Sequence, residues 1–152
     1  MSYFWVLKIE TILELNYGIE EIKEVSDFIL QNTDGKILLV CGDVGSGKTT
    51  LIKEICKQLK VTDKVSSPTY TLINEYACND GLVVHMDLYR VENNEDINDL
   101  GLFEYFDNKF IIIEWPELIM TDLDINHTIL KIDFINTNKR RINLTNILSW
   151  VF

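Results

Sequence analysis

Apolar side chains recur along the first third of the chain at spacings that alternate between those of strands and those of helices. Ile9–Leu15 has the pattern of an extended segment, and Gly18–Gln31 carries apolar residues three or four positions apart, as an amphipathic helix does. The apolar run in Lys36–Cys41 predicts a buried strand, and Lys48–Lys60 predicts a second amphipathic helix. The apolar positions of the two helices are Ile19, Ile22, Val25 and Ile29 in the first and Leu51, Ile52, Ile55 and Leu59 in the second. This order predicts the start of a parallel α/β unit.

The middle of the chain predicts a loop, a hairpin, a short helical region and another strand. Val61–Thr69 is polar and contains Pro68, which has no place in a central strand, so it is expected to be a loop. The two strands of the hairpin are joined across Asn79–Asp80–Gly81, a turn composition. The remaining expected elements are strands at Thr71–Ala77, Leu82–Asp87 and Lys109–Glu114 and one or two short helices within Glu92–Phe106.

Alternating apolar and polar residues return near the end of the chain. Thr128–Phe134 and Arg141–Ile147 show this alternation, with Asn136–Asn138 between them, and predict a second hairpin. The sheet is therefore expected to be mixed, parallel around the strand at Lys36–Cys41 and antiparallel toward its edges. The fold class that follows is a small three-layer α/β sandwich, with residues 1–152 forming one domain.

Composition narrows the functional classes. The chain has 14 basic and 24 acidic residues and a net charge of −10, which argues against strong direct binding to a nucleic-acid backbone. Cys41, Cys56 and Cys78 lie far apart and form no metal or redox pair, so they are expected to be small core fillers in a reducing cytosol. The apolar stretch Tyr3–Leu7 is too short for a signal peptide, and a cytoplasmic location is expected.

The most informative local sequence lies between the first buried strand and the second helix. Gly42–Thr49 fits the phosphate-binding loop pattern G-x-x-x-x-G-K-[ST] at every fixed position. Glycines at these positions let successive N–H groups point at an anion, and the following helix adds the positive end of its dipole. Lys48 is expected to reach the outer phosphates of a nucleotide, and the Thr49 hydroxyl is expected to ligate Mg²⁺.

Two predicted strands end in a carboxylate, Asp87 and Glu114. Ligands of α/β sheets bind at the carboxyl ends of strands, so both acids can face the phosphate loop. We favour Glu114 near the metal ion and Asp87 as its partner, although the reverse assignment stays open. For either acid, a helix cap or an exposed strand end is the alternative. His85 lies on the same strand face as Asp87 and is expected to be a hydrogen-bonded support rather than a base. His127 has no partner in the sequence and is expected at the surface.

A hydroxyl-rich loop, Ser66–Thr71, precedes the first hairpin at the place where nucleotide-switch proteins sense the terminal phosphate. Thr69 is its best candidate contact, and a plain connecting loop is the alternative. The chain has only three arginines, Arg90, Arg140 and Arg141. For Arg90 two roles remain open: a salt bridge to the acidic segment Glu92–Asp99, which is slightly favoured, or a charge donated to the transferring phosphoryl group.

The motifs together resemble one known family. Gly42–Thr50, Ser67–Thr71, His85–Arg90 and Ile113–Glu117 occur in the order and at close to the spacing of the TsaE (YjeE) family of bacterial ATPases. These proteins are needed for the threonylcarbamoyl modification of adenosine in the anticodon loop of tRNA. The resemblance covers most of the chain, from about Ile19 to Arg141, and H-x-D-L-Y-R followed by E-W-P is its most specific part.

The resemblance implies an ATP or ADP site with Mg²⁺, in which Lys48, Asp87 and Glu114 serve catalysis and Thr49 and Glu114 hold the metal ion. The nucleotide-binding residues expected on this basis are Gly42, Asp43, Val44, Gly45, Ser46, Gly47, Lys48, Thr49, Thr50, Thr69, Trp115 and Arg140.

The family resemblance also implies protein partners, the TsaB–TsaD pair, whose turnover ATP hydrolysis would drive. The tRNA would be bound mainly by these partners and only indirectly by this chain, in agreement with the charge of −10. Three departures from the family pattern are visible. Val44 and Ser46 replace a leucine and an alanine in the loop, Lys139–Arg141 stands where relatives have a Gly-Arg turn, and residues 1–8 form an extension.

Rival functions are a small-molecule kinase, a GTP switch and a non-catalytic nucleotide-bound scaffold. Kinases of this size usually bring several arginines over the phosphates on a lid. This chain has only three arginines, two of them adjacent, which argues against a kinase. The guanine-reading N-K-x-D motif is missing, because Asn138–Arg141 and Asn108–Ile111 both lack its aspartate. The scaffold uses the same residues as an ATPase and stays open until hydrolysis is measured.

Overall fold

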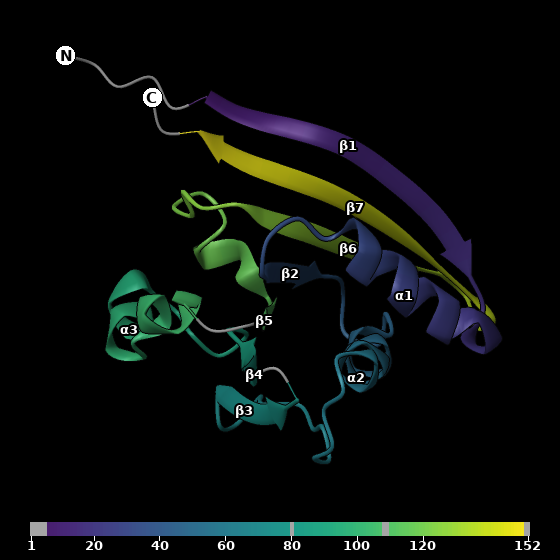
Figure 1. Ribbon diagram of the computed structural model, residues 1–152, viewed down its shortest axis with the longest axis horizontal. Coiled ribbons are helices and arrows are strands. Elements are labelled where there is room, and N and C mark those ends of the chain that lie inside the picture. Colours follow the sequence, from purple (N-terminus) through teal and green to yellow (C-terminus); the bar gives the residue numbers. More distant parts are fainter. Residues whose placement is uncertain (1–5, 80, 108–109, 151–152) are drawn as a thin grey trace.

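A seven-stranded mixed sheet forms the centre of the computed structural model, which describes residues 6–79, 81–107 and 110–150 (Figure 1). The strands are β1 (Val6–Tyr17), β2 (Ile37–Cys41), β3 (Ile73–Cys78), β4 (Gly81–Asp87), β5 (Phe110–Glu114), β6 (His127–Asn136) and β7 (Lys139–Trp150). Their order across the sheet is β1-β7-β6-β2-β5-β4-β3. The pairs of β2 with β5, β2 with β6 and β4 with β5 are parallel, whereas the outer pairs are antiparallel. The predicted mixed sheet is confirmed.

Helices cover both faces of the sheet. On one face lie α1 (Ile22–Asn32), which follows the 3₁₀ turn η1 (Ile19–Glu21), and α2 (Lys48–Gln58). On the other face lie α3 (Asn94–Asp99) and the 3₁₀ segment η2 (Leu102–Asp107), and a further 3₁₀ turn, η3 (Pro116–Leu118), follows β5. Figure 1 shows α1 and α2 beside one another and α3 apart from them. The three-layer sandwich is therefore confirmed.

The central strand β2 shows why both faces need covering. Its residues Ile37, Leu38, Leu39 and Val40 are all buried, and successive side chains enter opposite core clusters. Val25, Ile29 and Leu51 from the two long helices complete one cluster, and Ile97 and Leu102 contribute to the other. A short parallel strand without polar residues has apolar side chains on both faces, so helices must cover both faces of the sheet.

Two positions differ from the sequence-based expectation in their burial. Ile19 belongs to the apolar series predicted for the first helix, yet its side chain is 64% exposed. It lies in η1, whose 3₁₀ geometry turns it away from the face that α1 presents to the core. His127 was predicted at the surface and is instead 2% exposed, which makes that prediction wrong. It opens β6, and its Nδ1 lies 2.7 Å from the carbonyl oxygen of Ile125, so a main-chain group satisfies the buried ring.

The ends of some elements also shift. β3 begins at Ile73 and not at the predicted Thr71, because Leu72 has a left-handed backbone (φ 67°) that no strand accommodates. Of the predicted extension, residues 6–8 belong to β1, and residues 1–5 lie outside the described part of the chain. Asp80 in the predicted turn and Lys109 at the start of a predicted strand also lie outside it.

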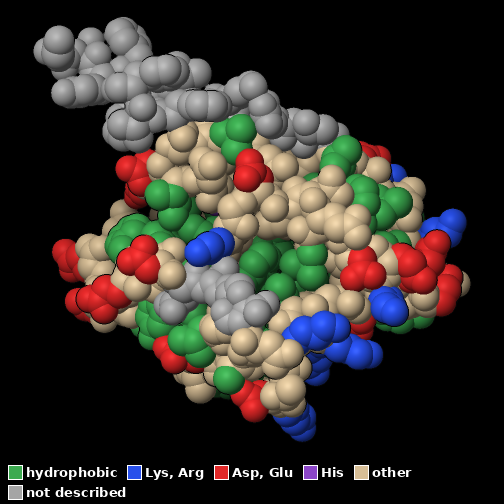
Figure 2. Space-filling view, in the orientation of Figure 1, with side chains coloured by type: hydrophobic (Ala, Val, Ile, Leu, Met, Phe, Trp, Pro, Cys, Tyr) green, Lys and Arg blue, Asp and Glu red, His purple; other side chains and the backbone are tan. Residues whose placement is uncertain are grey.

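The surface reflects the acidic composition. Figure 2 shows acidic side chains scattered over the face seen there, with lysine and arginine side chains gathered over α2 and the loop after it. No helix within the described residues has the length and apolar content needed to cross a membrane.

Candidate functional site

Three neighbouring parallel strands bring the candidate residues to one edge of the sheet. Asp87 at the end of β4 and Glu114 at the end of β5 are direct register partners, and Val40 of β2 pairs with Glu114 from the other side. The chain leaves β2 at Cys41 and enters the phosphate loop at Gly42. Strand register alone therefore sets both carboxylates beside the loop, at the edge where α/β sheets bind ligands.

The loop itself curls around the start of α2. Gly45 (φ 79°) and Gly47 (φ 105°) take left-handed backbone conformations, and Gly47 caps the helix whose first residue is Lys48. A side chain at Gly42 would place its Cβ 2.7 Å from Ser46 Oγ, so the loop closes this tightly only with glycine there. The Lys48 ammonium donates to the carbonyl oxygens of Gly42 and, at 2.9 Å, of Asp43. Its charge is thus held at the centre of the loop.

A cavity of about 520 Å³ opens in front of the loop. Its lining residues are Val44, Gly45, Gly47, Lys48, Thr49, Thr50, Ser67, Thr69, Asp87, Tyr89, Glu114, Trp115 and Arg140. Most of the residues expected from the sequence are therefore brought together. Gly42, Asp43 and Ser46 are not among the lining residues, although all three belong to the loop. Ser67 and Tyr89 were missing from the expected set, although both belong to sequence motifs of the family, Ser67–Thr71 and His85–Arg90.

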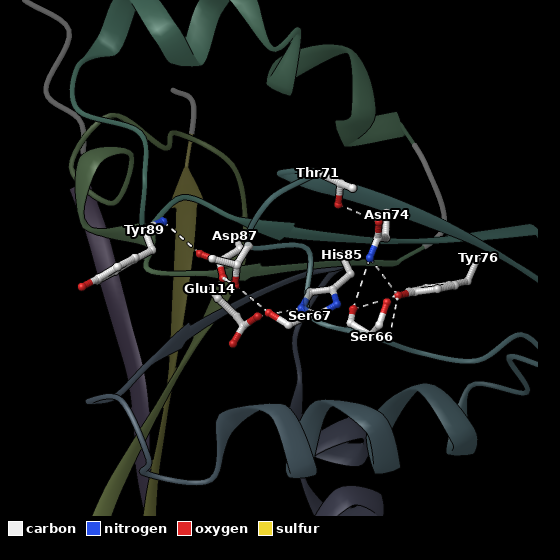
Figure 3. A network of polar contacts seen from close by, with 10 residues as sticks. Ser66, Ser67, Thr71, Asn74, Tyr76, His85, Asp87, Tyr89 and Glu114 are labelled. Carbon is white, nitrogen blue, oxygen red and sulfur yellow. Dashed lines mark hydrogen bonds and ion pairs between the residues drawn. The ribbon is translucent and has the colours of Figure 1, made fainter.

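Both carboxylates are nearly buried and held by hydrogen bonds. Asp87 is 4% exposed, and its two oxygens accept from Thr69 Oγ1 at 3.0 Å and from the Tyr89 N–H at 2.9 Å. Glu114 is 3% exposed, and its Oε2 lies 2.8 Å from Nε2 of the buried His85. Figure 3 shows the two acids next to one another, with His85 beside Glu114. The geometry gives His85 the position of a hydrogen-bonded support.

The hydroxyl-rich loop Ser66–Thr71 reaches the site because β3 holds its beginning. The Tyr76 hydroxyl donates to the Ser66 carbonyl oxygen at 3.1 Å, and the Asn74 amide donates to the same oxygen at 3.2 Å (Figure 3). At the other end, the Leu72 carbonyl oxygen accepts from the Asp87 N–H at 3.0 Å. Asp87 is consequently tied to this loop twice, by its main chain and through Thr69.

Two aromatic rings, those of Tyr89 and Trp115, line the cavity. The Trp115 ring centroid lies 4.5 Å from Lys48 Nζ and 4.9 Å from the Tyr89 ring. Burial lowers the pKa of Lys48, and the negative charges of Glu114 and Asp87 oppose that shift. The ring quadrupole of Trp115 favours the same positive charge, so the ammonium is stabilised from two sides.

Two arginines meet the region in different ways. Arg140 donates from Nε to the Ser46 carbonyl oxygen at 2.8 Å and from Nη1 to the Asn136 carbonyl oxygen at 2.7 Å, which fastens the β6–β7 turn to the phosphate loop. Arg90 instead lies 5.2 Å from the ring centroid of Tyr70 on the outer rim. The contact with Tyr70 is compatible with both roles left open for Arg90, the salt bridge and the donated charge.

The residues present suit a triphosphate with magnesium. Ser46 Oγ is buried in the loop and has no hydrogen-bond partner, the kind of group that an anion bound in the cradle would satisfy. Carboxylate and hydroxyl oxygens are the ligands that Mg²⁺ prefers, and Glu114, Asp87 and Thr49 all line the cavity. Within the described residues, no cluster of three or more His, Cys, Asp and Glu side chains has the geometry of a metal site. Mg²⁺ usually binds one or two carboxylates and takes its other ligands from phosphates and water.

Comparisons with known proteins agree with the motifs. A family model described as "Threonylcarbamoyl adenosine biosynthesis protein TsaE" matches residues 18–142. A Bacillus subtilis protein named "tRNA threonylcarbamoyladenosine biosynthesis protein TsaE" is 40% identical over 114 residues, which is 73% of this chain and 70% of that protein. One of the same name from Aquifex aeolicus is 35% identical over 138 residues, 89% of this chain and 94% of its own length. A crystal structure of Bacillus subtilis YdiB superposes with a TM-score of 0.70 at 29% identity and covers 92% of this chain and 86% of that chain.

Proposed function

We propose that this chain, which belongs to the TsaE family of threonylcarbamoyl adenosine biosynthesis proteins, binds ATP with Mg²⁺ and hydrolyses it in support of that biosynthesis. One observation carries the proposal. A glycine loop with Lys48 at its centre faces two nearly buried carboxylates, Asp87 and Glu114, across one cavity. A plain glycine-rich turn would not need charged groups buried opposite it, because removing carboxylates from water is unfavourable even where hydrogen bonds hold them.

Each group has a distinct task in this proposal. The loop N–H groups and Lys48 hold the β- and γ-phosphates, and Thr49 with Glu114 provides protein ligands for Mg²⁺. When bound between these residues and the phosphates, the metal ion would supply positive charge that offsets the negative charge growing during transfer. Asp87 orients the attacking water, because Thr69 and the Tyr89 N–H fix its carboxylate at the wall of the same cavity.

The partner in the proposal is the TsaB–TsaD pair, and hydrolysis by the chain alone is slow. Among the described residues that line the cavity, Arg140 is the single arginine, and its guanidinium is already engaged by the carbonyl oxygens of Ser46 and Asn136. In related phosphate-loop proteins, an arginine supplied by a partner raises the rate by about 10³- to 10⁵-fold. Tyr70, which is 86% exposed, and Tyr89 present aromatic surface beside the cavity, where a protein partner can dock.

Phosphate release tests the proposal directly. We expect Lys48→Ala to lower partner-stimulated release by about 10²- to 10³-fold, because one preorganised charge is lost. Lys53→Ala is the matched control, since Lys53 is an exposed lysine of the same helix outside the cavity. Near-normal turnover by Lys48→Ala would overturn the assignment. ATP binding without turnover, with or without the TsaB–TsaD pair, would instead identify a nucleotide-bound scaffold.

A further inference from the structure

A second hollow lies between the phosphate loop and β6. Its volume is about 550 Å³, and it shares Val44 and Gly45 with the phosphate cavity. These two are the central residues of the turn that the Ser46 N–H closes onto the Asp43 carbonyl oxygen at 3.0 Å. The described residues that line this β6 hollow are Asp43, Val44, Gly45, Ser46, Ile132, Asp133 and Phe134. The roles proposed above for the loop and the two buried carboxylates leave the hollow without a task.

Strand register explains why the hollow forms. β2 and β6 are parallel neighbours, and Cys41 at the end of β2 pairs with Lys131 (Figure 1). β6 continues to Asn136, so residues 132–136 run past the end of β2. The chain turns at that point from β2 into the phosphate loop. The β6 hollow therefore lies where strand pairing stops and the loop begins.

The lining combines exposed apolar side chains with acids. Val44 is 80% exposed and Phe134 is 56% exposed, so two large apolar side chains meet water at one hollow. Asp43 and Asp133 also line it, whereas the described lining residues include no lysine or arginine. Asp133 pairs loosely with Lys131, at 3.8 Å, and both side chains are largely exposed, so this ion pair is weak. The hollow is complementary to a cationic side chain that lies next to an apolar one.

We propose that the β6 hollow docks an extended segment of the TsaB–TsaD pair that carries a lysine or arginine beside an apolar side chain. This inference rests on the proposed function, which names that pair as the partner. Tyr89 lines the phosphate cavity, and the cavity meets the hollow at Val44. A stable interface covers about 800 Å² of each partner. A partner that docks at Tyr89 therefore has the area to cover the loop and enter the hollow.

Docking in the hollow acts on the phosphate site through the main chain of the loop. The Asp43 carbonyl oxygen accepts from Lys48 Nζ at 2.9 Å and from the Ser46 N–H at 3.0 Å. A segment seated against the Asp43 side chain therefore fixes the residue whose main chain holds Lys48. This contact gives the partner a second means of raising the hydrolysis rate, besides an arginine supplied to the phosphates.

Affinity for the immobilised TsaB–TsaD pair, measured by biolayer interferometry with ADP and Mg²⁺ present, tests the inference. We expect Asp133→Asn and Phe134→Ala each to weaken partner binding by about 10-fold, the size of one contributing interface residue, and to leave ADP affinity unchanged. Added NaCl should weaken partner binding by the wild type more than by Asp133→Asn, because the substitution removes a charge that salt screens.

The opposite face of the sheet supplies matched controls. Phe103 of η2 is 52% exposed, close to the 56% of Phe134, and Asp99 is an exposed acid of α3. Neither is among the described residues of the β6 hollow. Phe103→Ala and Asp99→Asn should therefore bind the TsaB–TsaD pair as the wild type does. Thermal unfolding of each variant identifies any that has not folded.

The outcomes distinguish this inference from the proposed function. Wild-type partner binding by Asp133→Asn and Phe134→Ala, or an equal loss in the two controls, would overturn the docking hollow and leave the ATPase proposal standing. Loss of ADP affinity by Phe134→Ala would also overturn it, because Phe134 would then act by holding Arg140, whose guanidinium carbon lies 4.5 Å from its ring centroid. Substitutions that changed the sedimentation of the chain alone and spared partner binding would assign the hollow to a second copy of this chain. A wild-type chain that did not bind the pair would overturn the partner named in the proposed function together with this inference.

Discussion

The hydrogen bond from Thr69 to Asp87 offers a sharp test of how the site works. Thr69→Val keeps the shape of the side chain and removes the hydroxyl that donates to Asp87 Oδ2 at 3.0 Å. A hydrogen bond to a charged group contributes about 1.5–3 kcal/mol, and the half-buried position of Thr69 favours the lower end. We therefore expect partner-stimulated phosphate release to fall by about 10-fold, because a loss of about 1.4 kcal/mol of transition-state stabilisation is tenfold in rate.

The same loop supplies a matched control. Thr71 lies two residues further on and donates to Asn74 Oδ1 at 2.9 Å, away from both carboxylates. Thr71→Val should leave turnover unchanged, and Thr69→Ser should restore it, since serine keeps the donor. The affinities of Thr69→Val for ADP and for a non-hydrolysable ATP analogue add a second readout. If Thr69 contacts the terminal phosphate, the substitution should weaken binding of the analogue and leave binding of ADP unchanged. Equal turnover by Thr69→Val and Thr71→Val would refute the argument.

Three further predictions follow from individual contacts. Trp115→Gly should leave thermal stability nearly unchanged, because glycine takes a left-handed backbone without strain. The same substitution should weaken nucleotide binding in calorimetry, because the ring over Lys48 is lost, and Trp115→Phe should retain binding. Burial raises the pKa of the Cys56 thiol from 9.0 to about 12, so between these pH values the folded protein keeps a proton that the unfolded chain has lost. The free energy of unfolding should therefore fall as the pH rises through this window, and urea titrations of Cys56→Ala should show a shallower fall. Arg90→Ala should reduce phosphate release only when the TsaB–TsaD pair is present if Arg90 serves docking beside Tyr70, whereas loss of turnover with intact binding of nucleotide and partners would favour a catalytic charge.

Local patterns in the sequence were sufficient to predict most of the fold. The strand at Ile37–Cys41 and the helix at Lys48–Gln58 follow from apolar periodicity, and the glycines between them follow from the backbone that a phosphate loop needs. The ends of β4 and β5 were predicted because an acid follows a run of apolar residues in each. Parallel pairing then makes the two acids neighbours without further information, since the ends of such strands meet at one edge.

The remaining features depend on contacts between residues far apart in sequence or on main-chain groups. The burial of His127 depends on the carbonyl oxygen of Ile125, and carbonyl oxygens leave no trace in the residue types. The exposure of Ile19 depends on a 3₁₀ turn where the periodicity predicts continuous helix. The fastening of Arg140 to Ser46 joins positions 94 residues apart, so only the paired β1, β6 and β7 strands bring them together.

Backbone strain in the described residues is concentrated at the candidate site. Lys60, Leu72 and Trp115 are the non-glycine residues with positive φ. Lys60 follows the end of α2, where a left-handed residue is an ordinary way to finish a helix. Leu72 and Trp115 do not follow an α-helix, although the Leu72 N–H closes a turn onto the Pro68 carbonyl oxygen, and each conformation costs about 1–3 kcal/mol.

Both strained residues hold a carboxylate in place. The carbonyl oxygen of Leu72 accepts from the Asp87 N–H, and Trp115 follows Glu114 directly and turns its ring over Lys48. Because a left-handed residue persists only where its surroundings enforce it, the packing around β3, β4 and β5 must stabilise these two turns. A more relaxed backbone at either position would let the adjacent carboxylate move relative to the phosphate loop. The strain is therefore the expected consequence of fixing two buried acids opposite a loop that binds anions.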